Sequence, residues 1–182
     1  MRPVAVVLVL LVETSHYPPV DAIQMPDAAV GVVQYTAQTP SFHIFLTGKP
    51  RMAVRDALDG AVRRLGKAEC DRLFSDFRDA NGQRPSAVLA ASGATAGEYL
   101  ARLYFVDADA DRCRADEALA AFTTPGSRVV HICGDRFAER FARNIRGAEI
   151  LLIHELLHTL GVGENPPSAA TITASVYRRC GD

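Results

Sequence analysis

The sequence has almost no excess of charge, with 20 Lys and Arg against 21 Asp and Glu. Domains that bind nucleic acid usually carry a basic excess because they neutralise phosphates, so this balance argues against a nucleic-acid partner. The sequence also lacks any apolar run near the length of about 20 residues that a membrane-spanning helix needs. Hydrophobic residues nevertheless make up 48% of the 182 residues, which indicates a soluble globular protein with a sizeable core.

The first 22 residues have the pattern of a secretory signal peptide. Arg2 is a short positive region, Val4 to Val12 is an unbroken apolar run, and Val20-Asp21-Ala22 offers small residues for cleavage after Ala22. We therefore expect residues 1–22 to be removed, leaving a secreted or periplasmic protein with no stable membrane anchor. Because no repeat or linker follows, residues 23–182 are predicted to form a single domain. Alternatively, the Val-rich run forms a buried N-terminal strand.

The sequence has four cysteines but no C-x-x-C pair, which argues against a cysteine zinc site or a thioredoxin-like redox site. An even number fits disulfide bonds in an exported protein, and four cysteines allow three pairings. We favour Cys113–Cys133, which closes a segment between two predicted core elements, and Cys70–Cys180, which ties the C-terminus to the first helix. The alternative is four reduced, buried thiols in a cytosolic protein.

The residues with the clearest chemistry are His154, Glu155 and His158, which form an H-E-x-x-H motif in a strongly apolar stretch. On a helix the two histidines lie about 40° apart on one face, so they can bind one metal ion while Glu155 reaches a water on it. With five His and eight Glu in the chain, the motif arises by chance roughly 0.006 times. Burying these side chains without partners is costly, and a metal removes that cost. The alternative is a buried helix with two hydrogen-bonded histidines.

A third ligand is predicted at Glu164. Gly161 follows His158 by three residues and can end the helix in a left-handed conformation, after which the chain doubles back. Asn165 precedes Pro166, which favours an extended exit from this turn. We therefore expect Glu164 to offer an oxygen ligand beside the two histidines; the alternative is an exposed carboxylate at the helix end.

His154, Glu155, His158, Gly161 and Glu164 together resemble the zincin metallopeptidases. The frame H-E-x-x-H-x-x-G-x-x-E is similar to that of the metzincin branch, with Glu in the place of its usual His or Asp, although no Met follows Met52 to form that branch's Met-turn. The resemblance covers residues 148–167 and implies a minimal zincin-like α+β fold: a small mixed sheet, a long N-terminal helix and a buried H-E-x-x-H helix.

The same resemblance implies a zinc metalloendopeptidase that acts as a monomer on peptides or proteins. His154, His158 and Glu164 would bind Zn²⁺, and Glu155 would be the general base that activates water. Two alternatives stay open. Metal-dependent endoribonucleases of ribosomal RNA maturation share the ligand spacing but lack a Glu in the second position of the motif. A secreted binding module with a structural metal would need a closed, four-ligand site.

Patterns along the chain predict the following elements. Strands are expected at Val30–Tyr35, Phe42–Leu46, Ala87–Ala91, Tyr99–Val106 and Ser127–Cys133. Helices are expected at Met52–Phe77 (one helix or two), Ala115–Phe122, Asp135–Ala142, Ala148–Leu160 and, capped by Ser168, Ala169–Arg179.

Three weaker candidates for a functional role have simpler explanations. Asp107 to Asp111 resembles the start of a calcium loop, but Gly and Glu are missing at its sixth and twelfth positions, so a solvated turn is expected. His131 lies in a predicted strand that could approach the metal, and Tyr177 could reach it from the last helix. Both are expected to be ordinary packing positions.

Overall fold

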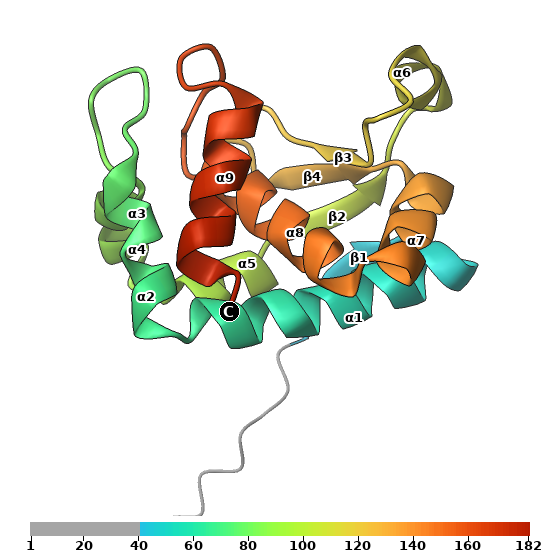
Figure 1. Cartoon of the computed structure of the whole chain (residues 1–182), viewed down its shortest axis with the longest axis horizontal. Helices are drawn as coiled ribbons and strands as arrows, with labels where there is room; N and C mark the ends of the chain where they lie inside the picture. The colour runs from blue at the N-terminus through green and yellow to red at the C-terminus, as the bar shows by residue number, and fades with distance from the viewer. Residues whose placement is uncertain (1–40) are drawn as a thin grey trace, which may run out of the picture. The chain divides into compact units, whose positions relative to one another are not determined.

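A computed structural model describes residues 41–182, which form a mixed α and β structure (Figure 1). The predicted signal peptide and the predicted strand at residues 30–35 lie outside the described residues. The strands are β1 (His43–Phe45), β2 (Tyr104–Asp107), β3 (Ala121–Phe122) and β4 (Val129–Ile132). The helices are α1 (Gly48–Leu65), α2 (Ala68–Asp71), α3 (Leu73–Asp76), α4 (Pro85–Ser92), α5 (Ala96–Ala101), α6 (Ala110–Ala115), α7 (Gly134–Arg143), α8 (Ile145–Thr159) and α9 (Ala169–Cys180).

The four strands form one small mixed sheet in the order β1-β2-β4-β3. The first three are parallel, with Ile44 opposite Phe105 and Phe105 opposite Val130, and β3 runs antiparallel to β4 at the end of the sheet. Ile44 in β1, Phe105 in β2, and Val130 and Ile132 in β4 are buried next to more exposed neighbours, as expected for a sheet with one face packed on a core. The expectation of an α+β structure with a small mixed sheet is therefore confirmed.

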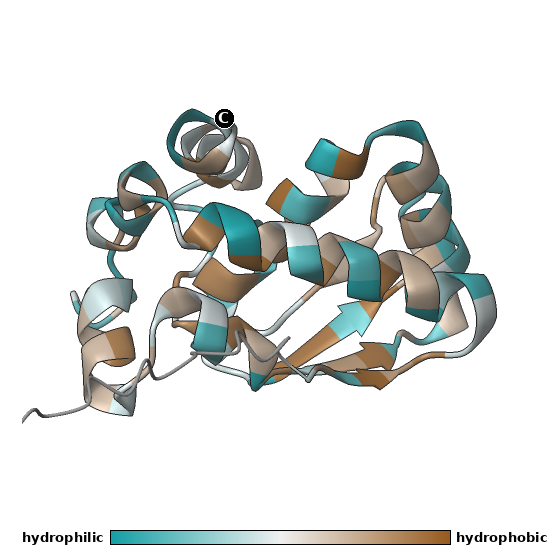
Figure 2. Cartoon of the chain, turned by 90° about the horizontal axis from the view of Figure 1, so that it is seen from below, coloured by the Kyte–Doolittle hydropathy of each residue, from teal (hydrophilic) through white to brown (hydrophobic). Residues whose placement is uncertain are grey.

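The long helix α1 crosses beneath α7 and α8 and packs against both (Figures 1 and 2). Its buried side chains follow helical spacing: Val54, Ala57, Leu58, Ala61 and Leu65. The helix ends at Gly66, and two short helices, α2 and α3, complete the stretch that was predicted as one helix or two. The stretch is therefore three helices rather than one or two, and α1 runs through Gly60 without a break.

Residues 85–107 differ from the prediction. The expected strand at Ala87–Ala91 is helix α4, which starts with Pro85 in its first turn and ends at Gly93 with a φ of 62°. The expected strand Tyr99–Val106 is split into helix α5 and strand β2. Thr95 and Glu98 form a capping box that starts α5. In both places helix-capping residues, rather than the apolar pattern, determine the structure.

The prediction of a helix at Ala115–Phe122 is also wrong. Asp109 accepts hydrogen bonds from the backbone N–H groups of Asp111 and Arg112, so α6 begins earlier and ends at Ala115. Phe122 instead pairs with His131 in the antiparallel ladder. The aspartate-rich stretch is thus the start of a helix, where a side-chain oxygen satisfies free N–H groups.

The C-terminal third follows the prediction closely. Helices α7, α8 and α9 form within a few residues of the expected bounds, and Ser168 accepts a hydrogen bond from the N–H of Thr171 at the start of α9. Both favoured disulfides, Cys113–Cys133 and Cys70–Cys180, are present. Within residues 41–182, no helix has the length and apolar character needed to cross a bilayer.

Candidate metal centre

Helix α8 carries the H-E-x-x-H motif through the centre of the core. The Asn144 side chain accepts a hydrogen bond from the N–H of Gly147 and so caps the first turn. The helix packs against α1, α7 and α9 and also contacts β3 and β4. Apolar residues on more than one side of the helix are fully buried: Ile150, Leu152, Ile153, Leu156 and Leu157. This packing fixes the positions of the polar residues between them.

The two histidines face each other, with their Nε2 atoms 2.9 Å apart. The Nδ1 atom of each ring, on the side away from the other histidine, has a hydrogen-bond partner. His158 Nδ1 donates a hydrogen bond to the carbonyl of Val162 at 2.7 Å, and His154 Nδ1 lies 2.9 Å from the hydroxyl of Thr173 on α9. Because a carbonyl only accepts hydrogen bonds, His158 carries its proton on Nδ1, which leaves a lone pair on Nε2. Such support from outside the ligand set is typical of histidines that bind a metal.

Glu164 returns to the histidine pair, as predicted. Gly161 takes a φ of 99° and turns the chain after α8. Glu164 Oε1 then lies 3.3 Å from His158 Nε2 and 3.6 Å from His154 Nε2. The extended exit expected at Asn165 is wrong, because this residue has a φ of 63° and its N–H donates to the carbonyl of Pro167. Asn tolerates this conformation better than most residues, and the tight turn results.

The three ligand atoms have the spacing that a single metal ion needs. Zinc bonds to His nitrogen and carboxylate oxygen of about 2.0–2.2 Å imply that tetrahedral ligands lie about 3.3 Å apart. Separations of 2.9, 3.3 and 3.6 Å are close to this value. Two imidazoles and one carboxylate are also a donor set that zinc favours, and three protein ligands leave one position open. His154, His158 and Glu164 therefore form a group that can hold a metal ion.

Glu155 lies beside this group and is only 4% exposed. Among the described residues, its Oε2 atom is buried and has no hydrogen-bond partner. Burial, together with the nearby charge of Glu164, raises the pKa of Glu155 to about 8. A carboxyl group in this state is ready to accept or release a proton near neutral pH.

The His154 imidazole is neutral in this environment at neutral pH. Burial, and then the neighbouring His158, lowers the pKa of His154 to about 4, against a partly opposing effect of Glu164. The neutral imidazole is the form that binds metals, so burial prepares His154 as a ligand at neutral pH.

The site opens into a cleft of about 690 Å³. Glu155, His158 and Glu164 lie on one side of it. The opposite sides are formed by β3 and the residues after it, and by the segment that contains α6; the lining residues there are Arg112, Asp116, Leu119, Ala121, Phe122, Thr123, Thr124 and Pro125. Solvent and a ligand therefore have access to the metal-binding group.

The weaker candidates do not join the site. The His131 ring stacks on that of Phe122, with centroids 4.9 Å apart, and so packs on the sheet. Tyr177 lies on α9 with its ring 5.8 Å from the guanidinium of Arg146. Sequence reasoning missed Thr173 and the carbonyl of Val162, which orient the two imidazoles. No pattern in the sequence indicates them, because their role depends on how α9 and the turn pack against α8.

Comparisons with known proteins add nothing to this geometry: no protein-family model, curated protein or solved structure matches the chain.

Proposed function

We propose that the protein is a zinc-dependent peptidase of the zincin type. One observation carries this proposal: two buried imidazoles and a carboxylate converge on one point, and beside them the buried Oε2 of a second carboxyl group, Glu155, has no hydrogen-bond partner within residues 41–182. Leaving a buried polar group unpaired costs free energy, so its presence next to a ligand set favours a chemical role over a structural one.

Each residue of the group has a distinct task in this proposal. His154, His158 and Glu164 would hold the ion, and Thr173 and the Val162 carbonyl fix the direction of the two rings. When bound, zinc supplies a Lewis acid that brings the pKa of water down to about 7. Glu155 takes the proton from the attacking water and delivers it to the leaving amine.

The position of the sheet supports an extended peptide as the substrate. Strand β3 lies at the end of the sheet, and in the part of the chain that the structure describes it pairs only with β4. Ala121, Phe122 and Thr123 line the cleft beside Glu155. An extended peptide can add to such an edge through backbone hydrogen bonds, which bind many sequences with similar strength.

The alternatives receive less support. An RNA substrate would favour a basic cleft, whereas Arg112 is the single basic residue among the described lining residues and acidic residues outnumber it. A purely structural metal would favour four protein ligands, and in residues 41–182 three residues form the group. The two disulfides fit an oxidising compartment, so we propose a secreted or periplasmic monomer.

The test of the chemistry is Glu155→Gln, measured by zinc content and by cleavage of an unstructured protein. The variant should keep its zinc and lose peptide hydrolysis by about 10²–10⁴-fold, because the amide cannot carry the proton. Glu139→Gln, an exposed change on α7, is the matched control and should behave as wild type. Wild-type turnover by Glu155→Gln would exclude the peptidase mechanism.

The test of the ligand set is Glu164→Ala, compared with Glu139→Ala. Removing one of three ligands should weaken zinc binding by more than the about 10- to 100-fold that loss of a supporting residue costs. The dissociation constants are measured by competition with a chelator. Equal affinity in Glu164→Ala and wild type would place the third ligand elsewhere.

A further inference from the structure

One wall of the cleft is formed by a segment that has few buried contacts with the hydrophobic core. Arg112, Asp116 and Leu119 line the cleft from the segment 110–119, which contains α6 and the turn after it; we name it the α6 wall. Within the described structure, α6 buries none of its own residues. Segments with few buried apolar contacts open easily, so the hydrophobic effect alone does not keep this wall in place.

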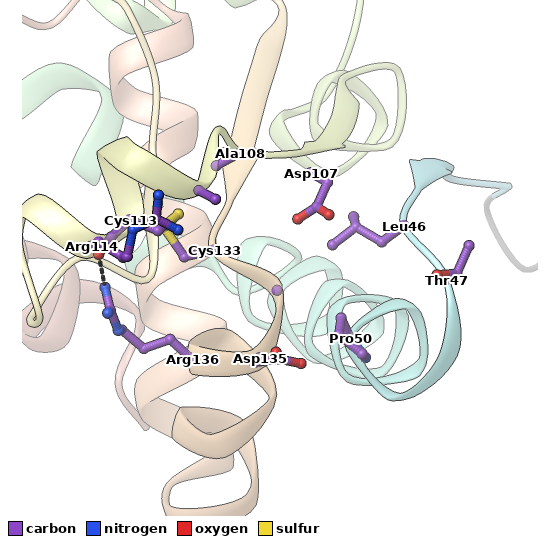
Figure 3. A pocket seen from close by; sticks show the side chains of 12 residues that line it. Leu46, Thr47, Pro50, Asp107, Ala108, Cys113, Arg114, Cys133, Asp135 and Arg136 are labelled. Carbon is purple, nitrogen blue, oxygen red and sulfur yellow. Dashed lines mark hydrogen bonds between the residues drawn. A yellow bond between two sulfur atoms is a disulfide. The ribbon is translucent and has the colours of Figure 1, made fainter.

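A set of hydrogen bonds from one arginine and one disulfide bond hold the α6 wall instead. Arg136 on α7 donates hydrogen bonds from Nη1 to the carbonyls of Cys113, Asp116 and Leu119, at 2.8, 2.6 and 2.7 Å. The Cys113–Cys133 disulfide joins the same segment to the residue just before α7. Figure 3 shows Arg136 reaching from α7 toward Cys113 beside this disulfide. Nη1 carries two hydrogens, so at least one of them is shared between two of the three carbonyls. The positive charge strengthens these bonds, and a single guanidinium thus contacts the segment at three points.

We propose that Arg136 is a positioning residue for substrate binding: it fixes the α6 wall, with the Cys113–Cys133 disulfide as its covalent support. This inference rests on the proposed peptidase function. Arg136 is not among the residues that line the cleft; the pocket drawn around it in Figure 3 is a separate one. Its three hydrogen bonds all go to the wall. The imidazoles of the metal group are held by Thr173 and Val162 instead. Loss of Arg136 therefore affects how a peptide is held and leaves the metal in place.

The kinetic test compares Arg136→Ala with Arg136→Lys and Arg143→Ala, each loaded with zinc. Arg136→Ala should raise KM for a peptide substrate by about 10- to 100-fold, the scale of a misplaced binding wall, with kcat and zinc affinity within about twofold of wild type. Arg136→Lys should recover much of the loss, because an ammonium group still offers three donors to the carbonyls. Arg143, whose partner Glu139 is exposed on the same helix, is the control. A fall in kcat at unchanged KM, or loss of zinc, contradicts the proposal.

The second measurement does not depend on activity. Hydrogen exchange of the backbone amides should accelerate in residues 110–119 of Arg136→Ala, while α8 and α9 keep their protection. Unchanged exchange in the α6 wall overturns the proposal whatever the kinetics show. If wild type cleaves no peptide, the proposed function fails, and exchange still decides whether Arg136 holds the wall. If Arg136→Ala does not fold, Arg136→Lys and the Cys113→Ala/Cys133→Ala double variant answer the same question.

Discussion

Two glutamates on α8 are almost equally buried and yet have opposite surroundings. Glu149 is 6% exposed and Glu155 is 4% exposed. Glu149 Oε2 accepts a hydrogen bond from Arg64 Nε at 2.5 Å. Glu155 Oε2 has no partner in residues 41–182. Because the residue type, the helix and the burial are alike, the difference supports a structural role for Glu149 and agrees with the chemical role that we propose for Glu155.

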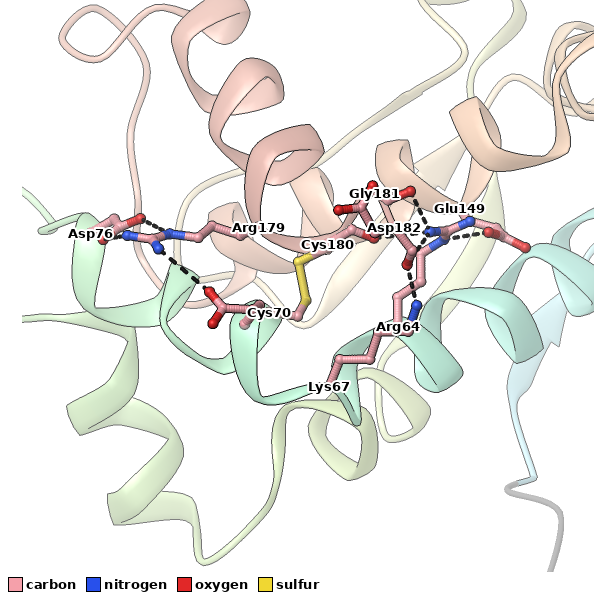
Figure 4. Close-up of a disulfide and its surroundings, with 10 residues drawn as sticks. Arg64, Lys67, Cys70, Asp76, Glu149, Arg179, Cys180, Gly181 and Asp182 are labelled. Atoms are coloured by element: carbon pink, nitrogen blue, oxygen red, sulfur yellow. Dashed lines mark hydrogen bonds and ion pairs between the residues drawn. A yellow bond between two sulfur atoms is a disulfide. The ribbon is translucent and has the colours of Figure 1, made fainter.

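The surroundings of Glu149 explain why it is paired. Gly60 on α1 provides the space, since a Cβ there would lie 1.9 Å from Glu149 Oε1. Arg64, one turn further along α1, also donates from Nη1 to the carbonyls of Cys180 and Gly181 (Figure 4). One guanidinium thus connects α1, α8 and the end of α9, next to the Cys70–Cys180 disulfide.

The largest expected effect is on stability. Glu149→Ala should lower the free energy of unfolding by about 3–5 kcal/mol, because it leaves the Arg64 charge partly buried without its partner. Glu155→Gln should cause no loss, because Oε2 has no bond to lose and the amide does not carry the cost of a buried carboxylate. Guanidinium unfolding of the metal-free proteins measures both, with Glu139→Ala as the exposed control. Equal losses from Glu149→Ala and Glu155→Gln would remove the distinction between the two carboxyl groups.

A second, smaller effect concerns pH. The raised pKa of Glu155 means that the folded, metal-free protein keeps a proton that the unfolded chain releases. Its contribution is complete below about pH 4.5 and is lost as the pH rises to about 8. The lowered pKa of His154 acts in the opposite direction: its contribution is complete above pH 6.5 and is lost as the pH falls to about 4. Metal-free protein should therefore be most stable between about pH 4.5 and pH 6.5, where the two effects offset each other.

Urea unfolding of chelator-treated protein at pH 4, 6 and 9 checks this expectation. Wild type should lose on the order of 1–3 kcal/mol between pH 6 and 9, and Glu155→Gln should not show this alkaline loss, since an amide does not titrate. An identical alkaline loss in both proteins would show that another group is responsible and that Glu155 is not the perturbed carboxyl.

The smallest expected effect concerns the support of His154. Thr173→Val keeps the shape of the side chain but removes the hydroxyl beside His154 Nδ1. Zinc binding should weaken by about tenfold, the lower end of the cost of losing such a group, with stability nearly unchanged. Thr171→Val, an exposed change on the same helix, is the control for chelator competition. Unaltered zinc affinity in Thr173→Val would show that α8 alone orients the ring.

The metal group was predictable because its information is local. His154, Glu155 and His158 sit on one helix, and Gly161 brings Glu164 back within a single turn, so spacing alone places four side chains together. The disulfides were predictable on broader grounds, from an even count and the order of the core elements. The assignment of these residues to zinc and to peptide hydrolysis stays a prediction.

The errors between residues 85 and 122 have a common cause. The apolar runs there are too short for periodicity to distinguish a helix from a strand, and capping decides. Pro85 and Gly93 bound α4, and Asp109 starts α6. Strand β3 has two residues and exists only through its pairing with β4. The support of the site by Thr173, and the pairing of Arg64 with Glu149, join segments 19 and 85 residues apart, which no local pattern can reveal.

The Cys70–Cys180 disulfide closes a loop whose ends are 110 residues apart in the sequence. The three side chains of the metal group and Glu155 lie inside that loop. A single backbone nick at any bond between the two cysteines, such as in the turn at residues 79–82 or the one at 163–167, therefore releases no fragment: the two pieces stay joined through sulfur. Only a reductant would separate the pieces.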